Sequence, residues 1–159
     1  MYKYRKLDKY DAPCLRNLYF QEEDIHMNFR QSQHYEARVR KIYGEMLMRG
    51  SYIYGCFDTE TKKLVASITV NKCLDCYPNY TDSPYVHLET FIVHKEYQNK
   101  GIGTQLLKHV LDVIKEEGCT YVIMQSNNPT IQHIANKAGL TNSLSDMRID
   151  FVEAISTNN

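Results

Sequence analysis

The sequence predicts one domain of the α/β (α+β) class, in which helices cover both faces of a mixed sheet. At 159 residues the chain is long enough to bury a core without disulfides. It contains no repeat or linker, so residues 1–159 are expected to form a single domain. Six segments have the apolar pattern of strands and four that of helices. Their order, β-α-α-β-β-β-α-β-α-β, places a meander of strands before a β-α-β unit, which requires a mixed sheet.

The first third of the chain predicts one strand and two helices. The alternation in YKYRKL, residues 2–7, is typical of a short strand. Asp8 or Asp11 is expected to cap the next helix, whose apolar residues are Leu15, Leu18 and Tyr19. A second helix should end before Gly50, a C-cap glycine, because apolar residues recur at helical spacing: Val39, Ile42, Tyr43, Met46 and Leu47.

Three strands are predicted in the middle of the chain. Residues 51–57 and 64–70 form two apolar runs joined by the polar segment DTETKK, which suits a hairpin loop. Residues 71–84 contain two prolines and several turn formers, so they are expected to form a loop. The third strand is YVHLETFIV, residues 85–93.

The last third predicts a helix, a strand, a helix and a strand. Residues 119–126 form a strongly apolar strand, and residues 146–155 form a final one. Between them, residues 128–139 begin with Asn-Pro, a cap followed by proline at the first helical position, and end in glycine. The earlier helix should end near Gly118 and present one apolar face: Leu106, Leu107, Val110, Leu111 and Ile114.

Composition limits the partners and the compartment. The chain has 19 basic and 19 acidic residues, so it lacks a bulk electrostatic reason to bind nucleic acid or an anionic membrane. No apolar run approaches the roughly 18 residues of a membrane span, and residues 1–11 lack the apolar segment of a signal peptide. We therefore expect a cytoplasmic protein that binds neither nucleic acid nor membrane.

The cysteines do not predict a metal site. Five cysteines in a chain with no export signal are expected to be reduced. Only Cys73 and Cys76 have the C-x-x-C spacing of metal or redox sites, and the chain has no second such pair to complete a zinc site. We interpret them as two loop thiols and predict no metal.

The turn YQNKGIGTQLL, residues 97–107, predicts an anion site. A dinucleotide fingerprint would need a third glycine where Leu106 stands, and a Walker loop would need its lysine after the glycines, whereas Lys100 precedes them. A strand, a glycine turn and a helix start bring free backbone N–H groups and a positive helix end together, which suits a pyrophosphate. The alternative is a tight turn in which glycine only relieves steric crowding.

Residues 89–119, ETFIVHKEYQNKGIGTQLLKHVLDVIKEEGC, resemble the acetyl-CoA-binding segment of the GNAT superfamily of N-acetyltransferases. That segment has a strand, a Q/R-x-x-G-x-G/A loop and a long helix. The element order and KAGL, residues 137–140, extend the resemblance over nearly the whole chain. Residues 77–90, with their Pro-Asn loop, resemble a bacterial subgroup that acts on small molecules. The resemblance implies a mostly antiparallel central sheet and acetyl-CoA as the cofactor and co-substrate.

The resemblance also implies cofactor-binding residues. The backbone of Phe91, Ile92 and Val93 would pair with the pantetheine arm. Asn128 matches a position near the thiol end of the cofactor, and this role is compatible with capping a helix. The loop and the start of the following helix would bind the cofactor through Gln98, Asn99, Lys100, Gly101, Ile102, Gly103 and Thr104. Of these, Asn99 to Thr104 would hold the pyrophosphate.

Acetyl transfer to an amine requires a base, because an alkylammonium has a pKa of about 10. Glu89 matches a glutamate that several family members use, and strand alternation predicts that it shares a face with Phe91 and Val93. The alternative is a carboxylate with a structural role in the sheet. His87 should lie on the same face as Glu89 and could relay a proton or bind substrate. Strand N–H groups of residues 91–93 could stabilise the oxyanion.

One family residue is missing. Many members have a tyrosine acid four residues before the glycine of KAGL, and this chain has Ala135 there. A thiol with a pKa of about 8.5 can leave unprotonated, so activity is still expected. Tyr121 and Tyr85 are alternative acids by the expected proximity of their strands, whereas His133 is expected on a helix surface.

The sequence therefore predicts an N-acetyltransferase that moves an acetyl group to a primary amine of a small molecule, with Glu89 as base. The acidic run at residues 21–24 falls where the family builds its acceptor site and could attract a cationic amine. A peptide or protein acetyltransferase is one alternative, and a non-catalytic acyl-CoA sensor, suggested by Ala135, is another. The sequence leaves open whether two copies form a homodimer.

Overall fold

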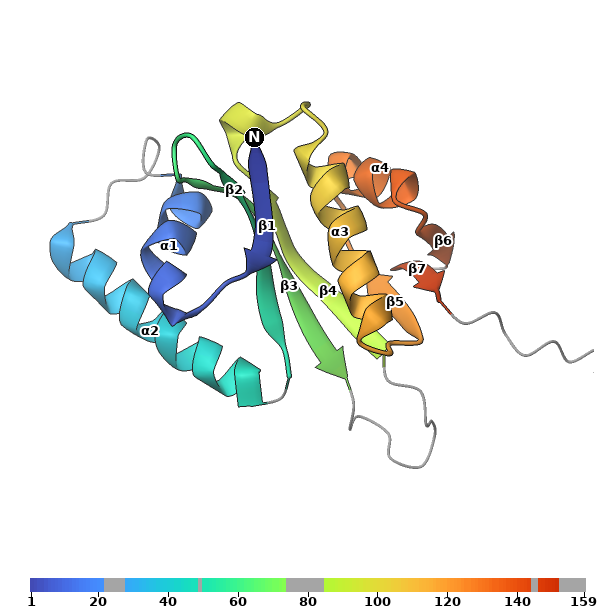
Figure 1. Ribbon diagram of the computed structural model, residues 1–159, viewed down its shortest axis with the longest axis horizontal. Coiled ribbons are helices and arrows are strands. Elements are labelled where there is room, and N and C mark those ends of the chain that lie inside the picture. Colours follow the sequence, from blue (N-terminus) through green and yellow to red (C-terminus); the bar gives the residue numbers. More distant parts are fainter. Residues whose placement is uncertain (22–27, 49, 74–84, 144–145, 152–159) are drawn as a thin grey trace, which may run out of the picture.

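One mixed sheet with helices on both faces organises the chain (Figure 1). The computed structural model describes residues 1–21, 28–48, 50–73, 85–143 and 146–151. Seven strands lie in the order β1-β2-β3-β4-β5-β7-β6, and every pairing is antiparallel except that of β4 with β5. Helices α1 and α2 cover one face, and α3 and α4 cover the other. The predicted fold class is confirmed.

The elements follow the predicted order with one additional strand. Two single-turn 3-10 helices, η1 and η2, precede α1 and α3. The bounds are β1 Tyr2–Lys6, η1 Lys9–Asp11, α1 Ala12–Phe20, α2 Phe29–Met48, β2 Tyr52–Asp58, β3 Leu64–Cys73, β4 Tyr85–Val93, η2 Lys95–Tyr97, α3 Ile102–Glu116, β5 Tyr121–Met124, α4 Pro129–Lys137, β6 Thr141–Ser143 and β7 Asp146–Asp150.

Strand β5 is shorter than the predicted residues 119–126, and other segments differ as well. Strand β6 was not predicted, because three polar residues give no apolar pattern. Strand β3 runs on through residues 71–73, which were predicted as loop, since they pair with β4. The rest of that loop, residues 74–84 with Cys76, lies outside the described residues, as do residues 152–155 of the last predicted strand and 22–24 of the acidic run.

The entry to α1 uses both predicted aspartates, in different ways. Asp8 caps η1 by accepting a hydrogen bond from the Tyr10 backbone N–H. The Asp11 carboxylate instead accepts two hydrogen bonds from the Arg5 guanidinium, at 2.7 and 2.8 Å, and one from the Asp8 backbone N–H. This pair connects β1 to the start of α1.

Helix α2 buries a narrower stripe than the sequence predicted. Tyr43 and Met46 are buried, but Ile42 and Leu47 are 47 % and 54 % exposed. The helix contacts α1 and β2 at one side of the sheet, so only part of its apolar face meets protein. By contrast, all five residues predicted for the apolar face of α3 are buried in the larger core cluster.

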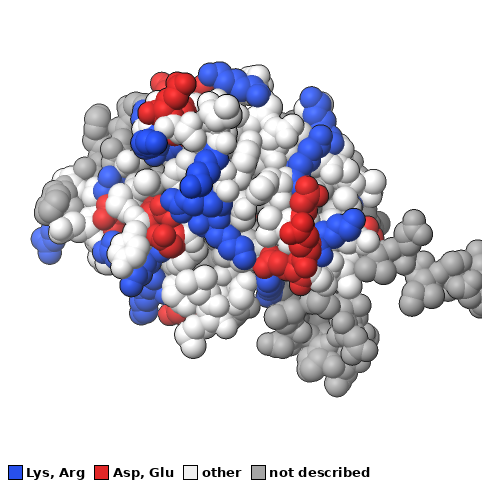
Figure 2. Space-filling view, in the orientation of Figure 1, with Lys and Arg blue, Asp and Glu red and all other residues white. Residues whose placement is uncertain are grey.

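The described surface agrees with the balanced composition. Basic and acidic side chains are interspersed over the face seen in Figure 2. Within the ranges that the structure describes, none of the helices combines the length and apolarity needed to cross a membrane.

Candidate active site

An opening in the sheet lies between β4 and β5. The two strands pair only from Tyr85 with Tyr121 to Leu88 with Met124. Strand β4 continues to Val93 beside β3, so residues 89–93 have an edge that β5 does not occupy. Such an edge has backbone groups available for another extended chain.

A β-bulge at this opening changes the direction of the side chains. Thr90 has φ +47°, and the register with β3 shifts between Thr69 opposite Glu89 and Ser67 opposite Ile92. The extra residue reverses the alternation. Phe91 and Val93 therefore pack in the core cluster that contains α3 residues, and Ile92 packs in the cluster of α1 and α2.

The predicted face of Glu89 was wrong for this reason. Glu89 lies opposite Thr69, which lines a cavity under α1 and α2, so Glu89 is on the α1/α2 face. Phe91 and Val93 are on the other face. Simple alternation could not reveal the bulge, because a threonine in a left-handed conformation has no sequence signature.

The start of α3 leaves backbone donors free of a side-chain cap. Asn99 has φ +61° and the N-cap Gly101 has φ +78°, so the chain turns sharply before the helix. The first helical hydrogen bond of this turn runs from the Gln105 N–H to the Gly101 carbonyl. Because no side chain caps this helix, its first N–H groups and positive end point at the adjacent space. This geometry suits a phosphate group.

The two glycines meet different requirements. A Cβ atom on Gly101 would have open space around it, so the left-handed φ is what favours glycine there. On Gly103, a Cβ atom would lie 3.0 Å from Ile134 Cδ1 and 3.1 Å from Val93 Cγ2. Gly103 therefore allows α3, α4 and β4 to approach one another.

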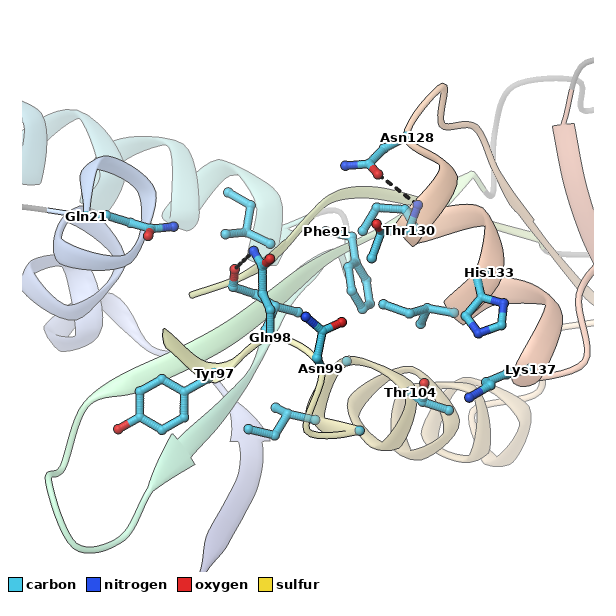
Figure 3. Close-up of a pocket in the computed structure, with 17 residues that line it drawn as sticks. Gln21, Phe91, Tyr97, Gln98, Asn99, Thr104, Asn128, Thr130, His133 and Lys137 are labelled. Atoms are coloured by element: carbon cyan, nitrogen blue, oxygen red, sulfur yellow. Dashed lines mark hydrogen bonds between the residues drawn. The ribbon is translucent and has the colours of Figure 1, made fainter. Parts of the chain in front are cut away.

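A cleft of about 520 Å³ joins the opening to the start of α3 (Figure 3). It passes from Gln21 at the end of α1 to the side chains of α4. Since Ile92 packs toward α1 and Phe91 toward α3, the cleft spans both faces of the sheet. Every residue that was assigned to the cofactor lines it except Lys100: Phe91, Ile92, Val93, Gln98, Asn99, Gly101, Ile102, Gly103, Thr104 and Asn128.

Gln21 and Tyr97 also line the cleft, and Gln21 belongs to the acidic run that was expected near the acceptor site. One face of α4 completes the described lining, and these α4 residues were not predicted to line it. Their recurrence along α4 at helical spacing was the signal that could have identified them. They are Thr130, Ile131, His133, Ile134 and Lys137. His133 is exposed, as predicted, but it does border the cleft.

Lys137 lines the cleft, whereas Lys100 does not. Lys137, at the end of α4, points toward Thr104 across the cleft (Figure 3). The Lys100 ammonium instead lies 5.3 Å from the centre of the Tyr97 ring.

Gln98 and Asn128 have structural contacts as well as positions on the cleft. The Gln98 side-chain amide donates to the Val93 carbonyl at 3.1 Å, which joins the turn to the end of β4. The Asn128 side-chain oxygen accepts from the Thr130 N–H at 2.9 Å and caps α4, as predicted. The amide NH₂ of Asn128 is the donor that this cap does not use.

Glu89 is bracketed by two side chains on the α1/α2 face. One carboxylate oxygen lies 3.1 Å from His87 Nδ1, and the other accepts a hydrogen bond of 2.6 Å from the Asn71 amide. The Glu89 side chain is still 43 % exposed. A carboxylate has about four lone-pair sites, so these two contacts leave room for an acceptor's proton.

The candidate acids lie far from this point. Tyr85 and Tyr121 stack face to face, with ring centres 4.9 Å apart. Tyr85 precedes Glu89 by four residues of β4, or roughly 13 Å along an extended strand. Ala135 is 0 % exposed and belongs to the larger core cluster. The structure therefore places neither Tyr85 nor Tyr121 at the opening, and position 135 is a buried alanine.

Comparisons with known proteins agree with this geometry. The profile of the acetyltransferase (GNAT) family matches residues 15–139, most of the chain. A sequence comparison with curated proteins finds no match.

Solved acetyltransferase structures share the fold. One from Trypanosoma brucei is 18% identical, with a TM-score of 0.72 over 95% of this chain and 100% of that one. A glucosamine-6-phosphate N-acetyltransferase from Arabidopsis thaliana is 17% identical (TM-score 0.69; 98% and 99% covered). A Salmonella typhimurium protein described as an acetyltransferase, solved with its cofactor acetyl-CoA, is 14% identical (TM-score 0.70; 98% and 96% covered). At these identities the likeness establishes the fold, whereas the profile match establishes the family. The chain belongs to the GNAT acetyltransferase family and is an acyltransferase that uses acetyl-CoA.

Proposed function

We propose that the chain transfers the acetyl group of acetyl-CoA to a primary amine of a small molecule, with Glu89 as the base. The observation that supports this most directly is the position of Glu89 beside an opening that leads through the sheet to the start of α3. The cofactor would enter from the α3 and α4 side, and the acceptor from the α1 and α2 side.

Cofactor binding would use groups already placed along the cleft. The uncapped N–H groups at the start of α3 would bind the pyrophosphate, with Lys137 nearby. The free edge of β4 at residues 91–93 would pair with the amides of the pantetheine arm. Acetyl-CoA would supply the acetyl group as an activated thioester.

The transfer itself would depend on Glu89. An ammonium bound at Glu89 would give its proton to the carboxylate, directly or through one water, and the neutral nitrogen would attack the thioester carbonyl. Asn71 and His87 hold the carboxylate in one orientation. Backbone N–H groups at the bulge would stabilise the oxyanion. The thiolate would leave without a positioned acid, since a thiol pKa of about 8.5 makes it a good leaving group.

The test is a panel of primary amines incubated with acetyl-CoA, in which free thiol and the mass of the acetylated product are measured. We expect thiol release that depends on both enzyme and amine, with one acetyl group added to the amine nitrogen. Acetylation of peptides but of no small amine would contradict the proposal. So would acetyl-CoA binding without turnover on any acceptor, which a sensor would give.

A further inference from the structure

A second cavity lies on the α1/α2 face of the sheet, apart from the cofactor cleft. It has a volume of about 380 Å³ and is lined by α1, α2, one residue of β2 and one of β3. Among the residues described there, all are apolar or aromatic except Arg38 and Thr69. The partial exposure of Ile42 is explained by its place in the wall of this cavity.

Residues paired across three neighbouring strands connect the floor of the cavity to Glu89, the candidate base. Ile53 of β2 pairs with Thr69 of β3, and Thr69 pairs with Glu89 of β4. Residues directly opposite one another in antiparallel strands point to the same face. Ile53 and Thr69 both line the cavity, and neighbouring strands are about 4.8 Å apart. Glu89 therefore lies one strand beyond the cavity floor.

The lining is electrically neutral apart from one cation. Burial raises the pKa of the Tyr19 phenol. Burial also raises the pKa of Tyr35 and of Tyr43 to about 12, so all three phenols are uncharged near neutral pH. None of the described lining residues is a carboxylate, and Arg38 is positively charged. An apolar group of an acceptor amine would fit this environment. The second ammonium group of a diamine would have no carboxylate among the described lining residues to pair with.

We propose that this cavity binds the apolar end of the acceptor. This assignment rests on the proposed function and narrows it: the preferred acceptors are primary amines that carry an aromatic or branched alkyl group on a short spacer. The amine would lie at Glu89, and the apolar group would lie over Thr69 and Ile53. Polyamines and amino sugars would be poorer acceptors, because they place charged or hydroxyl groups in an apolar cavity.

Matched amines provide the first test. In the series from propylamine to hexylamine, each added methylene should raise kcat/KM by about fourfold until the cavity is filled. A phenylalkylamine should exceed these, and each diaminoalkane should fall below the monoamine of the same length. Higher kcat/KM for diamines, or no dependence on chain length, would overturn the assignment.

Two variants of α2 provide the second test. Ile42→Asp places a carboxylate in the cavity wall, and Leu47→Asp makes the same change on the same helix away from the cavity. Ile42→Asp should lower kcat/KM for a phenylalkylamine by at least about tenfold, because a charged carboxylate would replace an apolar side chain that lines the cavity. Leu47→Asp should have little effect. If both variants changed kcat/KM for the phenylalkylamine equally, the assignment of the cavity to the acceptor would be wrong.

A binding measurement separates this inference from the proposed function. The neutral fluorescent probe N-phenyl-1-naphthylamine should bind the full chain, be displaced by a phenylalkylamine, and bind more weakly to Ile42→Asp than to Leu47→Asp. Displacement without thiol release from any amine would support the cavity assignment and contradict acetyl transfer to amines. Thiol release with polar amines alone, together with no displacement of the probe, would support acetyl transfer to amines and contradict the cavity assignment.

Discussion

Glu89 is the residue on which the proposed chemistry depends most. Its carboxylate lies at the bulge of β4, on the α1/α2 face, between Asn71 and His87. Glu89→Gln keeps the shape of the side chain and one acceptor oxygen for the Asn71 amide, while removing the ability to accept a proton. We expect turnover at saturating amine to fall by about 10²–10⁴-fold, the usual contribution of a general base. Acetyl-CoA binding, measured by calorimetry, should be unchanged.

Glu96→Gln is the matched control, because Glu96 is an exposed carboxylate that does not line the cleft. It should retain normal turnover. If Glu89→Gln were as active as Glu96→Gln, Glu89 would have only a structural role in the sheet.

The cation at the cofactor cleft gives a second prediction at this scale. Lys137→Ala should weaken acetyl-CoA binding by about two- to fivefold, the value of one solvent-exposed charge contact. The loss should shrink at high salt, where exposed charges are screened. Lys100→Ala should change the affinity less, since the Lys100 ammonium lies over Tyr97. A larger loss for Lys100→Ala, measured by the same calorimetry, would show that Lys137 was wrongly chosen.

Single residues were predictable where local chemistry decides their position. Asn128 as a cap and glycine at 101 follow from helix and turn geometry, which short sequences encode. The face of Glu89 and the neighbours of Lys100 were not predictable. They depend on a bulge at Thr90 and on how α4 packs beside α3, which are tertiary features.

Among the elements, α4 shows why the family's tyrosine cannot simply be restored. Ala135 is fully buried in the core. We expect Ala135→Tyr to lower the free energy of unfolding by about 1–3 kcal/mol or more through overpacking, and not to raise turnover. Asn136→Tyr, exposed on the same helix, should be close to neutral in denaturant unfolding. A stable Ala135→Tyr protein with higher turnover would mean that the added ring has found room at the opening.

The junction of β1 with α1 should respond to acid. Burial acts to raise the pKa of Asp11, but the hydrogen bonds from Arg5 and from the Asp8 N–H outweigh it, so the pKa lies below its ordinary value. A lowered carboxyl pKa contributes stability above the unfolded value of 3.8, and that contribution is lost as pH falls through the folded pKa.

Asp11→Asn should therefore be less stable than the unmodified chain by about 1–2 kcal/mol at pH 7. This is the lower part of the range for charged hydrogen bonds, since Arg5 is 36 % exposed. The difference should narrow below about pH 4, as denaturant unfolding at several pH values would reveal. Asp112→Asn, an exposed change on α3, serves as the control. A difference that stayed constant down to pH 2 would exclude the Asp11 carboxylate as its cause.

At the level of elements, strong periodicity gave correct predictions and weak periodicity did not. The apolar face of α3 and the bounds of β4 followed from the sequence. Strand β6 did not, because it is held by pairing with β7 rather than by its own composition. Part of the apolar face of α2 borders a cavity, so its exposure depends on α1 and the sheet.

Over the whole molecule, the order of elements predicted a mixed sheet with helices on both faces, because short connections leave few topologies. What the order could not give is the place where β4 and β5 separate. That separation connects the two faces of the sheet. Under the proposed function it would allow a cofactor bound at α3 to meet an acceptor bound under α1 and α2.

The most direct test of the cofactor site is calorimetric titration of acetyl-CoA into the unmodified chain and into Gly103→Val. The unmodified chain should bind with a Kd in roughly the micromolar range. A valine at 103 would collide with Ile134 and Val93 and narrow the cleft at the start of α3. Gly44→Val makes the same change in open space on α2 and is the control for folding and affinity. We predict that folded Gly103→Val loses at least about tenfold in affinity, or about 1.4 kcal/mol, while Gly44→Val binds normally. Normal acetyl-CoA binding by a folded Gly103→Val protein would contradict the placement of the cofactor at this turn.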